Sequence, residues 1–151
     1  MTSQTILLVE DNADDEALTL RAFEKSYIRN EVVVLRDGAE ALAYLFPGDR
    51  YGDGDGAPRA ALILLDLNLP KVGGLEVLRR MRTDERTRLI PVVVLTSSKL
   101  DEDILDSYRS GANAYVRKPV RFSDFADAVR ALGVFWLNLN EPAPSRGPES
   151  D

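Results

Sequence analysis

The chain contains no cysteine and no histidine. Without cysteine it can form no disulfide bond, no thiolate metal site and no thiol nucleophile. Without histidine it lacks a side chain needed for Ser-His-Asp triads, for histidine-ligated metals and for phosphohistidine carriers. Any reactive site must therefore use carboxylates, hydroxyls, lysine or arginine. Because missing cysteines are typical of reducing compartments, we expect a cytoplasmic protein.

Long apolar segments are missing too. No apolar run approaches the roughly 20 residues that cross a bilayer, and residues 1–4 are polar, unlike a signal peptide. We therefore expect no membrane association. The formal net charge is −6, and an acidic domain repels the phosphate backbone, so we expect no direct contact with nucleic acid.

The chain has 151 residues, of which 44% are hydrophobic and 29% are charged. These values predict one globular domain with an ordinary core. We assign residues 1–140 to that domain and residues 141–151, rich in proline, serine and glycine, to a disordered tail. Residues 47–58, rich in glycine and aspartate, form a predicted loop whose role stays open.

Short apolar runs indicate the strands. Their apolar character is continuous rather than alternating, which is typical of parallel strands that are covered on both faces. The four clear runs and a weaker fifth lie at residues 6–9, 32–35, 62–65, 92–95 and 114–116.

Helical spacing of apolar residues follows each run. Residues 14–25 show it, residues 37–40 resemble an N-terminal capping box, and Ser123 is expected to cap the last helix. Strand then helix, repeated five times, predicts an α/β fold with a parallel sheet and right-handed crossovers.

Polar residues follow the runs where each strand should end. Glu10 and Asp11 follow the first run, Asp66 the third, Thr96 the fourth and Lys118 the fifth. Ligands of parallel α/β sheets gather at this edge, so we expect these side chains to converge. Clustered carboxylates repel one another, and Mg²⁺ relieves that repulsion through oxygen ligands. A carboxylate there can attack phosphorus and form an acyl phosphate.

Each of these residues also has an ordinary structural explanation. Glu10 and Asp11 could precede and cap the first helix, Thr96 could enter a helix, and Lys118 could be a solvated surface lysine. Their occurrence together, in the right order on successive strand ends, favours a shared site.

The motifs resemble those of the response-regulator receiver family of two-component signalling, from about Thr5 to the end of the last helix. The resemblance implies a doubly wound, flavodoxin-like (βα)5 fold with a five-stranded parallel sheet. The matching residues are Glu10-Asp11, Asp66 within Leu-Leu-Asp-Leu-Asn-Leu-Pro, Gly73-Gly74, Leu-Thr-Ser ending at Ser97, Gly111-Ala112 and Lys118-Pro119.

The resemblance also implies a role for each site residue. Asp66 is the expected phosphoacceptor for a sensor histidine kinase. Asp11 is an expected direct Mg²⁺ ligand, together with Asp66. Glu10 acts beside it, and Asn68 contributes its backbone carbonyl.

The same resemblance implies a switch. Thr96 is the hydroxyl expected to move toward the phosphoryl group, Tyr115 occupies the aromatic switch position, and Lys118 is expected to pair with phosphoryl oxygens. The bond before Pro119 is expected to be cis, an isomer that costs little at proline.

One subgroup is closer: single-domain regulators paired with bacterial and cyanobacterial phytochromes. Three features carry this similarity: the long loop before Asp66, the Asp-Leu-Asn-Leu-Pro segment and the end at residues 135–137. It implies a bacteriophytochrome as kinase. The apolar stripe of the last helix extends past the expected sheet, so we expect a homodimer through the face of the fourth helix, fifth strand and fifth helix. The alternative is that this end of the stripe is buried against the domain itself. The stripe comprises Phe125, Val129, Leu132, Trp136 and Leu139.

Two other classes of protein were weighed. A phosphatase of the haloacid-dehalogenase type has its nucleophile on the first strand with a second aspartate two residues later, whereas Asn68 stands two residues after Asp66. A phosphorylation-independent interaction module would not need the complete set of site residues. We expect a phosphoacceptor signalling protein, not an enzyme, that assists its own Mg²⁺-dependent phosphotransfer and dephosphorylation.

Overall fold

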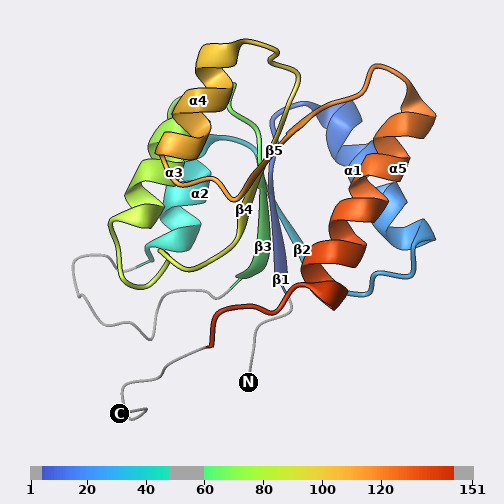
Figure 1. Cartoon of the computed structure of the whole chain (residues 1–151), viewed down its shortest axis with the longest axis horizontal. Coiled ribbons are helices and arrows are strands. Elements are labelled where there is room, and N and C mark those ends of the chain that lie inside the picture. The colour runs from blue at the N-terminus through green and yellow to red at the C-terminus, as the bar shows by residue number, and fades with distance from the viewer. Residues whose placement is uncertain (1–4, 48–59, 145–151) are drawn as a thin grey trace.

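The computed structural model describes residues 5–47 and 60–144. Five strands form one parallel sheet in the order β2-β1-β3-β4-β5 (Figure 1). The apolar runs are thus confirmed as strands, and the third begins two residues earlier than predicted. The strands are β1 (Thr5–Val9), β2 (Val32–Leu35), β3 (Ala60–Leu65), β4 (Val92–Thr96) and β5 (Ala114–Arg117).

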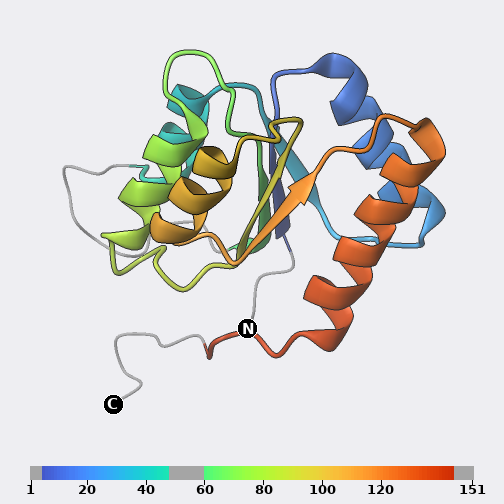
Figure 2. The same cartoon turned by 45° about the horizontal axis from the view of Figure 1, so that its top comes forward.

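Helices cover both faces of this sheet. Helices α1 and α5 lie side by side on one face, and α2, α3 and α4 lie on the other (Figures 1 and 2). This is the doubly wound, flavodoxin-like α/β fold that was expected. The helices are α1 (Ala13–Lys25), α2 (Gly38–Leu45), α3 (Gly74–Arg82), α4 (Asp101–Arg109) and α5 (Phe122–Gly133), which continues into the π-helical turn η3 (Val134–Leu139).

The core consists of two hydrophobic clusters, one on each face of the sheet. In β1, Leu7 and Val9 pack toward α2 and α3, while Ile6 and Leu8 pack toward α1 and α5. All four side chains are buried. Burial on both faces explains why the strand reads as an unbroken apolar run.

Side-chain caps position the first two helices. The Asn12 side chain accepts a 2.9 Å hydrogen bond from the Asp15 amide at the start of α1. At the start of α2, Asp37 Oδ1 accepts a 2.7 Å bond from the Glu40 amide, and this confirms the predicted cap. In return, the Glu40 carboxylate accepts a 3.1 Å bond from the Arg36 amide, one residue before the cap.

The predicted cap at Ser123 is wrong. Helix α5 begins at Phe122, and Arg121 in the N-cap position makes no side-chain cap. The Phe125 amide bonds to the Arg121 carbonyl at 3.0 Å. Ser123 therefore lies exposed within the first turn instead of before it.

Some predicted segments lie largely outside the described residues. Of the loop at 47–58 only Pro47 is described, and of the tail at 141–151 only residues 141–144, which form neither helix nor strand. The domain limit at residue 140 stays a prediction. Within the two described ranges, every helix is too short or too polar to cross a bilayer.

Candidate functional site

Backbone hydrogen bonds extend the sheet beyond its strands and position the site. The Asp66 amide bonds to the Val9 carbonyl at 3.1 Å, and the Lys118 amide bonds to the Thr96 carbonyl at 2.8 Å. The first residue after β3 and the first after β5 are thus held in register with their neighbouring strands. The predicted convergence at the carboxyl edge of the sheet is observed for Glu10, Asp66, Thr96 and Lys118.

The Asp66 carboxylate is the centre of the cluster, and this residue is only 7% exposed. Its Oδ1 accepts a 2.8 Å hydrogen bond from the Thr96 hydroxyl and a 3.2 Å bond from the Asn68 amide. Its Oδ2 lies 2.9 Å from the Lys118 ammonium nitrogen. Both oxygens are therefore oriented by named donors, as a nucleophile or phosphoacceptor requires.

Lys118 contacts three carboxylates at once. Its Nζ lies 2.7 Å from Glu10 Oε1, 2.8 Å from Asp15 Oδ2 and 2.9 Å from Asp66 Oδ2. The side chain is 7% exposed, so this is a buried charge compensated by several opposite charges.

Asp15 is the member of this cluster that sequence reasoning missed. It lies in the first turn of α1, where acidic residues are common because they favour the helix dipole. No local signal selects it, because Asp14 and Glu16 are acidic residues of the same turn.

Three carboxylates form a group that suits a divalent cation. Oxygens of Glu10, Asp11 and Asp66 all lie within 4.8 Å of one another. Glu10 and Asp66 are buried, whereas Asp11 is exposed, so the group opens toward solvent. Carboxylate oxygens in an open group fit a hard cation that keeps some of its water. For Asn68 the observed contact is its amide with Asp66, and its carbonyl stays a predicted ligand.

Burial and charge shift the pKa values of the central groups in different directions. Burial raises the pKa of Glu10 to about 7, against the pull of the Lys118 ammonium. Burial would also raise the pKa of Asp66, but Lys118 and the bonds from Asn68 and Thr96 hold it below its usual value. Although burial disfavours its charge, the three carboxylates raise the pKa of Lys118. The buried charges of Asp66 and Lys118 thus sustain each other.

Tyr115 lies on β5 beside this site and is half-buried. Its hydroxyl donates a 3.1 Å hydrogen bond to the carbonyl of Ser98, in the segment that follows β4. Burial raises the pKa of Tyr115. The ring is therefore tied to the loop that starts just after Thr96.

The predicted cis bond before Pro119 is wrong for this structure. None of the peptide bonds among residues 5–47 and 60–144 is cis. The two isomers of a bond before proline differ by only about 0.5–1 kcal/mol, so sequence alone does not determine which one the fold selects.

The parallel α/β fold and the carboxylate cluster at its carboxyl edge are those of a receiver domain. The family description "Response regulator receiver domain" matches residues 6–130, and the chain belongs to this family. The probable methanogenesis regulatory protein FilR2 of Methanothrix harundinacea is 43% identical over 141 residues, which are 93% of this chain and 88% of that protein. Response regulator Rcp1 of Synechocystis is 40% identical over 134 residues, which are 89% of each chain.

Solved structures agree with the subgroup resemblance. The Mn²⁺-bound form of Rcp1 superposes with a TM-score of 0.84 at 38% identity, covering 93% of this chain and 99% of that one. The phosphorylated cyanobacterial phytochrome response regulator RcpA gives 0.84 at 40% identity, covering 95% and 100%. The bacteriophytochrome response regulator RtBRR is 52% identical, with a TM-score of 0.69 and coverage of 95% and 86%. The expected similarity to phytochrome-paired regulators is confirmed.

Proposed function

We propose that this receiver accepts a phosphoryl group on Asp66 from the phosphohistidine of a sensor histidine kinase. The observation that carries the proposal is the Asp66 carboxylate, held on one oxygen by Thr96 and on the other by Lys118. An Asp66 oxygen attacks phosphorus, the phosphorus–nitrogen bond breaks, and the imidazole leaves. The Lys118 ammonium and the Thr96 hydroxyl then offset the charge on the phosphoryl oxygens.

We assign the cation site to Mg²⁺. Glu10, Asp11, Asp66 and the backbone carbonyl of Asn68 would hold it, because the clustered carboxylates supply the oxygen ligands that Mg²⁺ prefers. The metal would supply positive charge to the transferring phosphoryl oxygens. Glu10 is buried beside Lys118, so it acts best by holding a metal-bound water.

The phosphoryl group adds about −1.5 to −2 charges next to Thr96 and Lys118. Thr96 leads directly into the segment that contains Ser98. The backbone carbonyl of Ser98 accepts a hydrogen bond from the Tyr115 hydroxyl. A shift of Thr96 toward the phosphoryl group therefore pulls on Tyr115 and on the face formed by α4, β5 and α5. The added charge would thus shift the equilibrium between two arrangements of this face.

We propose that this protein acts in the cytoplasm and that its kinase is a bacteriophytochrome. RcpA is described as a phytochrome response regulator and RtBRR as a bacteriophytochrome response regulator, and both match 95% of this chain. This partner is tested by an assay of direct phosphoryl transfer from a phosphorylated bacteriophytochrome kinase. Lack of transfer would exclude the partner.

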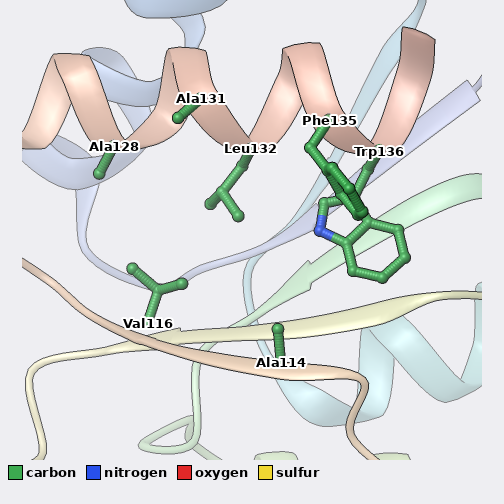
Figure 3. Close-up of a pocket in the computed structure, with 7 residues that line it drawn as sticks. All are labelled: Ala114, Val116, Ala128, Ala131, Leu132, Phe135 and Trp136. Carbon is green, nitrogen blue, oxygen red and sulfur yellow. The ribbon is translucent and has the colours of Figure 1, made fainter. Parts of the chain in front are cut away.

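We further propose that the output is a homodimer through the face of α4, β5 and α5. An apolar groove of about 410 Å³ lies between β5 and the end of α5 (Figure 3). Large apolar side chains on α4 and on the turn η3 are also exposed. The groove is lined by Ala114, Val116, Ala128, Ala131, Leu132, Phe135 and Trp136, and the exposed residues are Leu105, Tyr108, Phe135 and Leu139.

The dimer is tested by gel filtration with light scattering, with and without phosphorylation. Phe135→Asp is expected to give a monomer. Leu89→Asp is the matched control, because Leu89 is 64% exposed and lies between α3 and β4, outside the elements that form this face. A wild type that is monomeric in both states removes the dimer.

Phosphorylation itself is tested by intact-mass analysis with Mg²⁺ and a small acyl-phosphate donor. Wild type is expected to gain one hydroxylamine-labile phosphoryl group, and Asp66→Asn none. If wild type shows no adduct here and none with a phosphorylated kinase, the chain is a phosphorylation-independent interaction module.

A further inference from the structure

Asp15 belongs to the acidic cluster around Lys118 but has no role in the proposed phosphoryl transfer to Asp66. Its carboxylate lies 2.8 Å from Lys118 Nζ, which also contacts Glu10 and Asp66. We propose that Asp15 is a positioning residue that competes with the phosphoryl group for Lys118 and so limits how fully the phosphorylated state is populated. This role rests on the proposed phosphorylation of Asp66.

The competition follows from the donors of Lys118. An ammonium group has three N–H donors, and here it contacts Glu10, Asp15 and Asp66. No donor is left over for a new acceptor. Phosphorylation of Asp66 makes the donor that now contacts its carboxylate available to one phosphoryl oxygen. A second phosphoryl oxygen that pairs with Lys118 must displace Glu10 or Asp15, or share a donor with it.

Of Glu10 and Asp15, the two partners that are not phosphorylated themselves, Asp15 is the easier to displace. The Glu10 side chain is 3% exposed and also accepts a 3.1 Å bond from the Asn12 amide, so it has little freedom to turn away. The Asp15 side chain is 23% exposed and can turn toward water. Desolvation therefore opposes release of Glu10 far more than release of Asp15.

The backbone of Asp15 keeps its carboxylate close even when the ion pair is broken. Its amide donates to the Asn12 side chain at 2.9 Å, and its carbonyl accepts the Thr19 hydroxyl at 2.8 Å. The charge therefore stays near the phosphoryl group and repels it. Both effects, competition for Lys118 and repulsion, disfavour the phosphorylated state.

The test is titration with beryllium fluoride, a phosphoryl mimic, at saturating Mg²⁺, followed through the backbone amide resonances near Asp66. Asp15→Asn is expected to lower the half-saturating concentration about threefold or more, as expected for removing one nearby charge. Asp15→Glu is expected to restore a value close to that of wild type. The matched control is Asp14→Asn, which removes the same charge from an exposed position in the same turn of α1.

Urea unfolding of the same variants separates positioning from structure. If Asp15 only capped or stabilised α1, Asp15→Asn would lower stability and leave the half-saturating concentration unchanged relative to Asp14→Asn, and the competing role would be refuted. Weaker binding in Asp15→Asn would also refute it, because Asp15 would then be helping Lys118. A wild type that neither binds the mimic nor takes a phosphoryl group removes the proposed function and this role together. If wild type responds and Asp15→Asn matches it, only the role of Asp15 fails.

Discussion

The Thr96 hydroxyl donates a 2.8 Å hydrogen bond to Oδ1 of Asp66, and the two residues come from the ends of adjacent parallel strands. Thr96 is fully buried and Asp66 is 7% exposed, so water does not readily replace this bond. Thr96 thus orients the Asp66 carboxylate, in addition to its proposed part in the switch.

This contact predicts that Thr96→Val slows phosphorylation of Asp66. Valine fills the same space but removes the hydroxyl donor, and the loss of one oriented donor in a buried site costs about tenfold or more in rate. Thr96→Ser keeps the hydroxyl and is expected to react nearly as fast as wild type. The measurement is the time course of the phosphoryl adduct by intact mass with Mg²⁺ and an acyl-phosphate donor. Equal rates for the valine and serine variants would contradict this role of Thr96.

The two adjacent glycines of the Gly73-Gly74 pair are expected to tolerate alanine very differently. A Cβ at Gly74 would lie 2.3 Å from the backbone carbonyl oxygen of Asp66, whereas a Cβ at Gly73 meets nothing closer than 3.9 Å. Because backbone must move to relieve the first clash, Gly74→Ala is expected to destabilise by about 2 kcal/mol or more.

The same substitution should disturb the site, since the displaced backbone belongs to Asp66 itself. Urea unfolding and the phosphorylation time course are measured on both variants. Gly73→Ala is expected to match wild type in both, while Gly74→Ala loses stability and phosphorylates more slowly. A Gly74→Ala protein with unchanged stability would show that this close approach does not constrain the site.

The strands and most of the site were predictable because each left a strong local pattern. Strands buried on both faces read as continuous apolar runs, and the residue after each run falls at the carboxyl edge of the sheet. Glu10, Asp66, Thr96 and Lys118 were predicted in this way, and the structure brings them together.

Asp15 could not be selected in that way. Asp14, Asp15 and Glu16 are all acidic residues in the first turn of α1, and the helix dipole favours each of them alike. Only the rotation of α1 against the sheet determines that Asp15 meets Lys118. The isomer of the peptide bond before Pro119 could not be predicted from local sequence either, because the cis and trans forms are close in energy.

Asp84 gives a prediction of pH dependence away from the site. Its carboxylate accepts hydrogen bonds from the Arg86 side chain at 2.8 and 3.0 Å. These bonds are the main reason that the pKa of Asp84 is below its usual value. A lowered pKa in the folded state stabilises the fold above the unfolded pKa of about 3.9, and this contribution is lost as pH falls through the folded value.

We therefore expect Asp84→Asn to lower the free energy of unfolding by about 1 kcal/mol at pH 7. The difference from wild type should be undiminished at pH 6 and should shrink steadily below about pH 4. Urea unfolding at several pH values measures it. Glu85→Gln, an adjacent exposed position, is the control and should show little effect at any pH. A difference that stays constant down to acid pH would mean that the ion pair is not its source.

The proposed role of Asp11 as a cation ligand predicts that Asp11→Asn changes the free energy of unfolding in opposite directions with and without metal. Its carboxylate lies close to those of Glu10 and Asp66, so without a cation it adds repulsion. Asp11→Asn is therefore expected to be as stable as wild type or more stable when a chelator is present. A ligand that binds only the folded state stabilises it by about 2.7 kcal/mol at a concentration of one hundred times Kd. Wild type should gain this much from Mg²⁺, and Asp11→Asn should gain little, so the order of stability reverses.

Thermal unfolding with and without Mg²⁺ measures this reversal independently of any phosphoryl donor. Asp14→Asn is again the matched control, because it removes one exposed acidic charge from α1 and should keep the full Mg²⁺ response of wild type. An equal gain from Mg²⁺ in Asp11→Asn and wild type would exclude Asp11 as a ligand. Asp11 is proposed to bind the metal directly. That result would therefore mean that other carboxylates hold the cation, even if Asp66 is phosphorylated.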